Sequence, residues 1–238
     1  GFSLTSGSHN VALGHAALAS ATTGSHNTAL GTGAIRNANG GNNVGVGSDA
    51  CKGASGSTGN NNIGIGRTSL LSFTTGGANV AIGYASLDAN TTGANNIGIG
   101  YQALSSNTTA NNNVAVGINA LIANTTGIQN IGIGTSALVS NTTGSSNVAV
   151  GVFSLDANTT GQNNTSTGLH SLGHNTTANN NTAFGSFSLF NNTTGTSNVA
   201  VGADALVSNT TASNNTAVGF QSLKANTTGS ANVGVGVN

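Results

Sequence analysis

Short groups of apolar residues return along the chain at a nearly constant interval. Each group follows the order Asn, then Val, Ile or Thr, then a small residue, then usually Val, Ile or Leu, and then Gly. This order occurs fourteen times. Successive copies start 17, 16 and 19 residues apart, and after that 17 residues apart ten times in a row. A fixed period of this length predicts a solenoid, in which each repeat forms one turn and stacks on the next.

We number each repeat from its Asn as position 1 and call one repeat a rung. Position 2 is mostly Val or Ile, position 3 is Ala or Gly with one Ser, and position 5 is always Gly. Position 9 is Leu in every complete rung except two, which carry Ile35 and Cys51. Positions 12 to 14 read Asn-Thr-Thr in nine consecutive rungs and are followed by Gly or Ala.

Positions 2 to 4 predict a short strand, because β-branched residues two apart favour extended backbone and share one face. Gly at position 5 and the Asn-Thr-Thr-Gly segment are typical of bends. A helix is excluded because Gly and β-branched residues recur in every rung and no 3.6-residue period is present. We therefore predict an all-β fold, a parallel β-solenoid (β-roll) of about fourteen 17-residue rungs.

The rung interior is predicted to hold positions 2, 4 and 9, since a single rung can bury apolar side chains only against its neighbours. Cys51, in a Leu position, is expected to be a small buried side chain. The opposite side, positions 3 and 5, holds only Ala, Gly and one Ser, and we predict that it forms a close seam between subunits. In the regular rungs this interpretation assigns to the core Ile82, Leu87, Ile99, Leu104, Val116 and Leu121.

The rung that begins at Asn164 departs from the pattern. Thr165 and Thr167 stand where other rungs have the aliphatic pair. If both side chains point inward, their hydroxyls need hydrogen-bond partners or cost stability. On this interpretation Thr167→Val is expected to stabilise the fold.

The recurring Asn residues predict side-chain ladders along the stack. Amides at the same position of successive rungs would hydrogen-bond to one another. Asn-Thr-Thr is also an N-glycosylation sequon, but rungs about 4.8 Å apart leave no room for a glycan on each. The ladder residues at positions 1 and 12 include Asn79, Asn96, Asn113, Asn130 and Asn147, and Asn90, Asn107, Asn124, Asn141 and Asn158.

Composition narrows the functional classes. Of 238 residues only eight are Asp, Glu, Lys or Arg, and the net charge is zero. No basic surface is available for a phosphate backbone, so nucleic-acid binding is excluded. The apolar runs are far shorter than the roughly 20 residues of a membrane-spanning helix. A single cysteine excludes an internal disulfide framework.

No residue pattern supports catalysis, a metal site or a cofactor. Asp88 and Asp156 share position 10 but lie four rungs apart, roughly 19 Å at strand spacing, too far for paired carboxylate chemistry. His9 and His26 share position 17 in adjacent rungs, yet no third ligand accompanies them. We predict that the chain is not an enzyme.

The variable positions are expected to face outward. Their aromatic residues are candidates for contact with a receptor or a neighbouring chain: Tyr84, Tyr101, Phe153, Phe187 and Phe220. The chain is expected to be a single repeat array over 1–238, with irregular rungs over 27–61 and regular rungs over 62–238. It begins and stops inside a repeat, which favours a segment of a longer array over copies that stack end to end.

Two stretches resemble known repeats. Asn-Val-Ala-Ile-Gly at 79–83 resembles the head repeat of trimeric autotransporter adhesins, and residues 96–109 are similar to repeats of tail-fibre-domain proteins of bacteria and phages. The resemblance extends over essentially the whole chain, although the rung here is longer than the adhesin repeat. It implies a left-handed parallel β-roll, three chains around one axis, and a location outside the cell, on its surface or on a virion.

We therefore expect a structural protein, the rigid shaft or adhesive stalk of a homotrimeric fibre, with a host-cell or other surface receptor as a possible partner. Two alternatives stay open at this point. One is an extracellular filament that assembles end to end. The other is an ice-binding solenoid, for which the Thr rows would supply one outward hydroxyl per rung.

Overall fold

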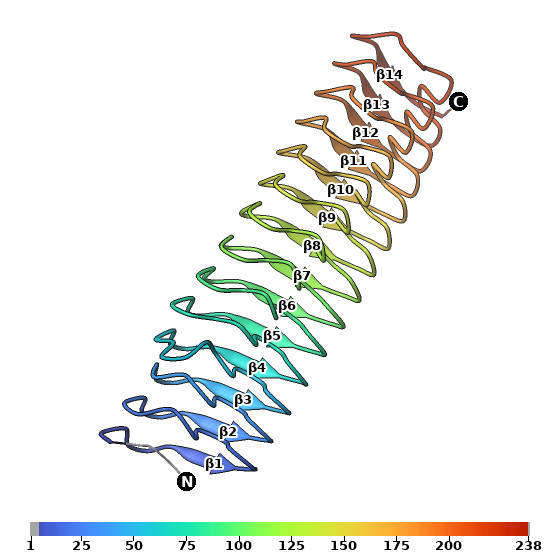
Figure 1. Ribbon diagram of the computed structural model, residues 1–238. Helices are drawn as coiled ribbons and strands as arrows, with labels where there is room; N and C mark the ends of the chain where they lie inside the picture. Colours follow the sequence, from blue (N-terminus) through green and yellow to red (C-terminus); the bar gives the residue numbers. More distant parts are fainter. Residues whose placement is uncertain (1–4, 238) are drawn as a thin grey trace. The chain divides into compact units, whose positions relative to one another are not determined.

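The computed structural model describes residues 5–237 and is all-β, with no helix in this range. The chain divides into two compact units, one up to Val116 and the other from Gly117 onward. Each unit contains seven strands of three residues, and every strand coincides with positions 2 to 4 of a repeat. Figure 1 shows the strands following one another in chain order. The predicted fold class, a parallel β-solenoid of 17-residue rungs, is confirmed.

The strand bounds repeat with the sequence period. The first unit holds β1 (Val11–Leu13), β2 (Thr28–Leu30), β3 (Val44–Val46), β4 (Ile63–Ile65), β5 (Val80–Ile82), β6 (Ile97–Ile99) and β7 (Val114–Val116). The second unit holds β8 (Ile131–Ile133), β9 (Val148–Val150), β10 (Thr165–Thr167), β11 (Thr182–Phe184), β12 (Val199–Val201), β13 (Thr216–Val218) and β14 (Val233–Val235).

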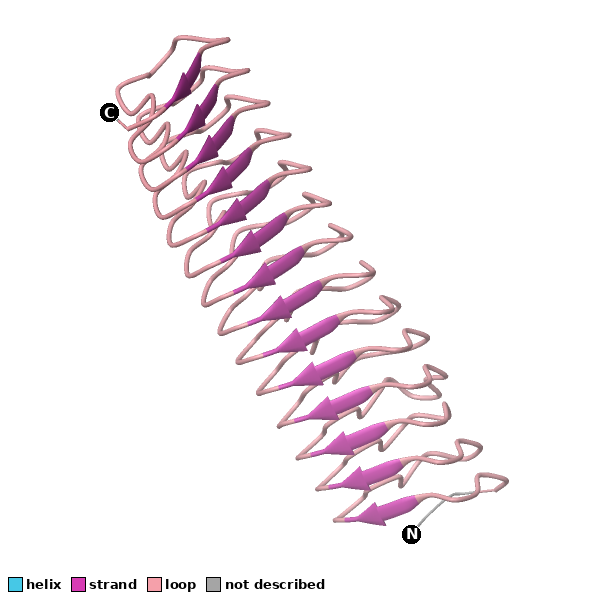
Figure 2. Ribbon diagram, turned by 180° about the vertical axis from the view of Figure 1, so that it is seen from behind, coloured by secondary structure: helices cyan, strands magenta, loops and turns pink. Residues whose placement is uncertain are grey.

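Within each unit, neighbouring strands pair in parallel and in strict register. Val80 lies opposite Ile97, and Ile82 lies opposite Ile99, so equivalent positions of successive rungs form continuous columns. Within either unit the strands point the same way in Figure 2, and the remaining residues of each rung return through bends. Backbone hydrogen bonds continue outside the strands, for example from the Leu87 N–H to the Ala103 carbonyl oxygen at 3.0 Å.

The rung interior differs from the prediction at the strands. Position 9 is confirmed as core, because Leu87, Leu104 and Leu121 are fully buried. Position 3, the small residue, is also buried, as Ala81 and Ala115 show. Positions 2 and 4 point to the other side of the sheet.

The assignment of Ile82, Ile99 and Val116 to the core is therefore wrong, since all three are partly exposed on the outward side.

Limited space explains why the small residue points inward. A Cβ added to Gly98 would lie 2.5 Å from Ser86 Oγ and 3.4 Å from Leu87 Cγ. At Gly132 it would lie 3.3 Å from Leu121 Cγ. One Leu per rung nearly fills the interior, so the strand can add only a small side chain such as that of Ala or Ser. The alternation of strand side chains then forces the larger Val and Ile outward.

The Thr-rich rung shows the same inversion. Thr165 and Thr167 lie on the outward side and are partly exposed. The prediction that their hydroxyls are buried is therefore wrong. The inward residue is Ser166, whose hydroxyl donates to the Ser171 carbonyl at 2.7 Å and accepts from Ser154 Oγ at 2.8 Å. The basis for expecting Thr167→Val to stabilise the interior is thereby removed.

The irregular rungs keep the strand register by placing the extra residues outside. Ala38 and Ser57 form an isolated parallel bridge, and residues 54–56, which come directly before Ser57, are exposed. Phe73 occupies position 12, where later rungs have Asn, and is the largest fully buried side chain. Val44 of β3 still pairs with Ile63 of β4 despite the 19-residue spacing.

Candidate functional site

The most distinctive surface of the molecule is the outward side of its strands. We define the sheet face as the side chains at positions 2 and 4 of the strands in each unit. These are aliphatic in most rungs but only partly covered: Ile97 is 37% exposed, Ile133 39% and Val201 37%. Large apolar side chains in regular, half-exposed columns are typical of a surface that another protein covers.

Exposed apolar side chains adjoin the sheet face in several rungs, although the position that they share holds polar residues or Arg67 in other rungs. Position 6 follows the Gly bend and carries Tyr84, Tyr101, Ile118, Leu169 or Phe220 in different rungs, each between 43% and 52% exposed. The Tyr84 and Tyr101 rings stack with centroids 5.3 Å apart.

The Gly bend at position 5, between the sheet face and position 6, has a clear structural cause. Gly151 has φ +139°, and a Cβ there would lie 2.5 Å from the Gly168 carbonyl oxygen of the next rung. Only glycine combines this backbone conformation with such close stacking. The invariant Gly therefore fixes the angle at which position 6 leaves the strand.

Charged residues avoid the sheet face. All eight lie at positions 6, 7 or 10, and the strands contain only Val, Ile, Leu, Thr, Phe and small residues. Lys52 and Asp49 form an ion pair at 3.6 Å away from the strands. A surface without charge imposes no electrostatic penalty when two identical copies meet.

The structure contradicts the residues that were predicted to face another chain. The sequence suggested that positions 3 and 5 face another chain, but position 3 is buried inside the rung, as Ala149 and Ala183 are. The strand residues assigned to the core are the ones that face outward. The error is a choice between the two sides of a strand, because alternation alone shows which residues share a side but not which side is inside.

The two predicted Asn ladders are present. At position 1, the Asn96 backbone N–H donates to Asn79 Oδ1 at 3.0 Å, and Asn96 Oδ1 in turn accepts from the Asn113 N–H at 3.0 Å. The Asn96 Nδ2 also donates to the Ala110 carbonyl at 2.8 Å. Each buried amide thus joins neighbouring rungs and satisfies a bend carbonyl.

The remaining position-1 residues follow the same pattern, with Asn147 N–H donating to Asn130 Oδ1 at 3.0 Å.

The position-12 ladder explains the recurring sequon. Asn158 Nδ2 donates to Asn141 Oδ1 at 2.8 Å and to the Gly161 carbonyl at 3.1 Å, and Asn107 Nδ2 donates to Asn90 Oδ1 at 2.9 Å. The fully buried Asn158 uses both amide protons inside the rung. Glycan attachment to this nitrogen is incompatible with the folded chain.

The same ladder contains Asn124, which accepts from Asn141 Nδ2 at 2.9 Å.

The two Thr residues of each sequon have different roles. The hydroxyl at position 13 donates to the position-13 carbonyl of the next rung, as Thr142 does to Thr159 at 3.1 Å. The residue at position 14, such as Thr143, is exposed. Each of these rungs therefore presents one outward Thr, and it lies in a bend segment rather than on the sheet.

An aromatic cluster occupies the outer surface of the second unit. Phe153, His170 and Phe187 stand at position 7 of consecutive rungs, and their rings stack with centroids 5.1 and 5.4 Å apart. Phe190 lies across them, 4.2 Å from the His174 ring.

Four of the five predicted contact residues are clearly on the surface. Phe153 is 36% exposed and Phe187 is half-buried within the cluster, whereas Tyr84, Tyr101 and Phe220 lie at position 6. The structure brings Phe153 and Phe187 into one cluster and Tyr84 and Tyr101 into another, and it leaves Phe220 apart from both.

Two position-10 carboxyl groups are partly desolvated. Burial raises the pKa of Asp88 above its ordinary value, and backbone N–H groups of Asp88 and Ala89 oppose this shift. Burial likewise raises the pKa of Asp156, while its own backbone N–H, His170 and His174 oppose the rise.

The remaining candidate groups are separate from one another. Burial raises the pKa of the Cys51 thiol to about 12, so the side chain behaves as the small apolar residue expected. The His9 and His26 rings stack 4.7 Å apart. Across residues 5–237, no three His, Cys, Asp or Glu side chains come close enough to hold a metal ion.

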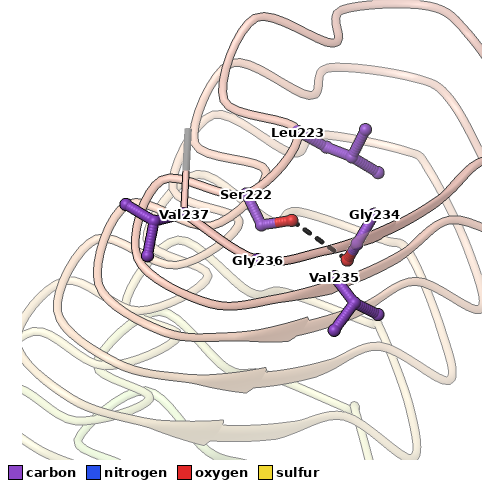
Figure 3. Close-up of a pocket in the computed structure, with 6 residues that line it drawn as sticks. All are labelled: Ser222, Leu223, Gly234, Val235, Gly236 and Val237. Atoms are coloured by element: carbon purple, nitrogen blue, oxygen red, sulfur yellow. Dashed lines mark hydrogen bonds between the residues drawn. The ribbon is translucent and has the colours of Figure 1, made fainter.

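Two of the pockets formed by residues 5–237 are small, and neither brings together side chains suited to catalysis or metal binding. One of about 200 Å³ lies at the last rung and is lined by Ser222, Leu223 and residues 234–237. In Figure 3 the Ser222 hydroxyl points at the Gly234 carbonyl, to which it donates at 3.0 Å. The other, of about 230 Å³, lies beside Lys52 and Leu71 at the irregular rungs.

These features define the chain as a parallel β-solenoid repeat protein with an uncharged apolar sheet face. No family model, curated protein or solved structure matches it in comparisons with known proteins. Between residues 5 and 237 there is no helix of the length and apolar character needed to span a bilayer.

Proposed function

We propose that this chain forms the shaft or stalk of a homotrimeric fibre outside the cell or on a virion, in which copies associate through their sheet faces. The observation that carries this proposal is the outward array of mostly Val and Ile at positions 2 and 4 of each unit. The resemblance of residues 79–83 and 96–109 to fibre and adhesin repeats supports the trimeric state, the left-handed winding and the location.

The area of the sheet face suits a protein interface. Full burial of a Val or Ile side chain removes on the order of 100 Å² of apolar surface from water. At the observed exposures, the fourteen positions of one unit leave on the order of 400 Å² open, against about 800 Å² per partner in a typical stable interface. Both units carry the same kind of face, and apolar side chains at position 6 adjoin it in several rungs.

A second copy of the chain is the partner that fits this face best. The columns repeat at the spacing of adjacent strands, about 4.8 Å, so a partner can contact every rung only if it has the same spacing. A second copy of the chain has the same spacing because it is built of the same rungs. The absence of charge at positions 2 and 4 also removes like-charge repulsion between copies.

A closed ring buries the sheet face of every chain at once. In a cyclic assembly each subunit contacts the one before it and the one after it, and sheet faces turned toward a common axis lie against one another. A trimer satisfies this arrangement and agrees with the resemblance.

The ice-binding alternative has weaker support. The sheet face is mostly Val and Ile, and the exposed Thr of each sequon, such as Thr109 or Thr126, lies in a bend rather than on the sheet. Thermal hysteresis in dilute solution would revive this alternative.

The solution mass tests the proposal. Sedimentation at micromolar concentration is expected to give three times the 22.9 kDa of one chain. The double variant Ile133→Lys/Val150→Lys places two charges on the sheet face and is expected to sediment as one chain with an unchanged β-type dichroism spectrum. A matched pair at exposed bend positions, Thr143→Lys/Thr160→Lys, should stay trimeric.

A mass of one chain for the unaltered protein would refute the proposal. So would a trimer that survives the two sheet-face lysines.

A further inference from the structure

A perfectly periodic face cannot align two copies in a unique way. Within each unit the strands pair in the same register throughout, as in Val199 opposite Thr216 and Val201 opposite Val218. A copy that slips by one rung would place Val and Ile columns on equivalent columns again. Only the contacts at the ends would be lost, so register is weakly specified wherever the face is uniform.

The sheet face of the second unit has its largest departure from Val and Ile in two adjacent strands. In β10 and β11, Thr165, Thr167 and Thr182 replace aliphatic residues, and Phe184 replaces a smaller one. Thr28 and Thr216 are the other Thr residues at these positions, and each stands alone in its strand. We call the four residues of β10 and β11 the interruption.

The interruption changes the surface without disturbing the backbone. Thr165 pairs with Thr182 and Thr167 with Phe184 in the same parallel register as the other strands. Phe184 is 42% exposed, so its ring stands out from the sheet. The three Thr side chains are partly exposed, and among residues 5–237 their hydroxyls take part in no hydrogen bond, which leaves them available to bond across an interface.

We propose that β10 and β11 set the register in which copies of this chain align, an inference that rests on the sheet-face assembly proposed above. In the aligned state the hydroxyls of one chain meet those of its neighbours at the same rung, and each hydroxyl can both donate and accept. The Phe184 rings of all chains then lie at the same rung.

A slip of one rung removes both features. Thr165 and Thr167 would lie against Val148 and Val150 of a neighbouring chain, and their buried hydroxyls would lack partners. The Phe184 ring would meet columns spaced for smaller side chains. A few polar residues in an otherwise apolar seam specify alignment in the same way in coiled coils.

Disulfide trapping between two labelled forms measures the register. Both forms carry Cys51→Leu, which restores the usual residue at position 9. One form has Ile131→Cys and Ile133→Cys in β8, and the other has Val148→Cys and Val150→Cys in β9. After the forms are folded together and oxidised, mass spectrometry separates links within one rung from links between β8 and β9. The 4.8 Å offset of a neighbouring rung takes most Cα pairs beyond the roughly 7 Å limit of a disulfide.

The aligned assembly is expected to give links within a rung almost exclusively. When the interruption is made uniform by Thr165→Val, Thr167→Val, Thr182→Val and Phe184→Val, links between β8 and β9 are expected to rise at least about fivefold. A control with the same type of change at exposed position 14, Thr160→Val, Thr177→Val and Thr194→Val, should leave the links unchanged.

Two results would overturn this inference while leaving the assembly intact: slipped links as frequent as aligned links in the unaltered face, or no rise when the interruption is removed. A chain that sediments alone and forms no interchain link would instead refute the proposed function, and the register inference with it.

Discussion

At the residue scale, this fold depends on left-handed backbone at non-glycine positions. Every regular rung has three such residues, at positions 7, 9 and 17, as Ala85 (φ 51°), Leu87 (φ 52°) and Ala78 (φ 56°) show. An ordinary residue pays roughly 1–2 kcal/mol for this conformation. It persists because the hydrogen bonds to neighbouring rungs define the backbone on both sides.

Position 17 offers a direct test of this strain. Ser197 is exposed with φ 57°, and two neighbouring rungs have asparagine at the same position, Asn180 and Asn214. Because Asn tolerates left-handed backbone, Ser197→Asn is expected to raise the free energy of unfolding by about 0.5 kcal/mol, whereas the β-branched Ser197→Val should lower it by at least about 1 kcal/mol. Denaturant titration of both variants checks the order, and a stabilising Val would contradict it.

The desolvated carboxyl of Asp88 predicts a pH effect. Its pKa in the folded chain lies above the ordinary 3.8, so the folded state binds the proton more tightly than the unfolded state. The penalty is therefore absent below pH 3.8 and grows as the pH rises through the raised pKa. Asp88→Asn is expected to increase the melting temperature at pH 7 and to make little difference below pH 3.8. An Asn variant that melts lower at pH 7 would contradict this sign.

At the scale of the element, a three-residue strand has too few contacts to be stable alone. Its stability comes from parallel pairing on both sides and from the buried Asn that precedes it. Since one Asn serves its own rung and the next, the ladder couples the rungs more strongly than the strands alone would.

Two adjacent asparagines show whether stability depends on the ladder itself or only on the presence of Asn in the rung. Asn96 is fully buried in the ladder, whereas its neighbour Asn95 is exposed at position 17. Asn96→Ala removes the acceptor of the Asn113 N–H and one of the two donors to the Ala110 carbonyl, which keeps its bond from Asn107, and it is expected to cost about 2–3 kcal/mol of unfolding free energy. Asn95→Ala should cost less than about 1 kcal/mol, because Ala already occupies this position in Ala78. Equal losses in denaturant titration would refute the ladder's role.

The orientation of the strand gives an equally sharp comparison. Ala81 faces the filled interior and Val80 faces outward. Ala81→Val is expected to destabilise by about 1–3 kcal/mol through overpacking. Val80→Thr, a residue found at this position in four other rungs, should stay within about 0.5 kcal/mol in the isolated chain. Thermal melts of both variants decide it, and the opposite ranking would restore the inward assignment of Val.

At the scale of the whole molecule, near-absence of charge shapes how the chain can associate. Eight charged residues among 238, none at positions 2 or 4, leave hydrophobic burial as the main driving force for the proposed assembly. Long-range electrostatic steering contributes little to such a surface.

This composition predicts how the assembly responds to salt. Because no ion pair is expected at the seam, the sedimenting mass should not fall between about 0.05 M and about 1 M sodium chloride. Sodium sulfate should strengthen the assembly, since it favours burial of apolar surface. Dissociation at high sodium chloride would instead indicate a charge-dependent contact elsewhere on the chain.

The repeat could be derived from the sequence because its signals are local. The Gly at position 5, the bends at 12 to 15 and the buried Leu at position 9 each have a direct chemical reason, and the structure places Leu104 and Asn107 where that reasoning expects them. The Asn ladders could be predicted because identical amides recur at one strand spacing.

The sequence by itself determined the period, the strand positions and the columns that successive rungs form. Only the tertiary structure decided which side of the strand is inside. Alternation gives two equivalent solutions, and hydrophobicity favours the wrong one, because Ile82 and Ile99 are more apolar than Ala81 and Gly98. The decision rests on volume: with Leu87 and Ser86 in place, the interior has no room for a branched side chain, so the apolar residues form the outer surface.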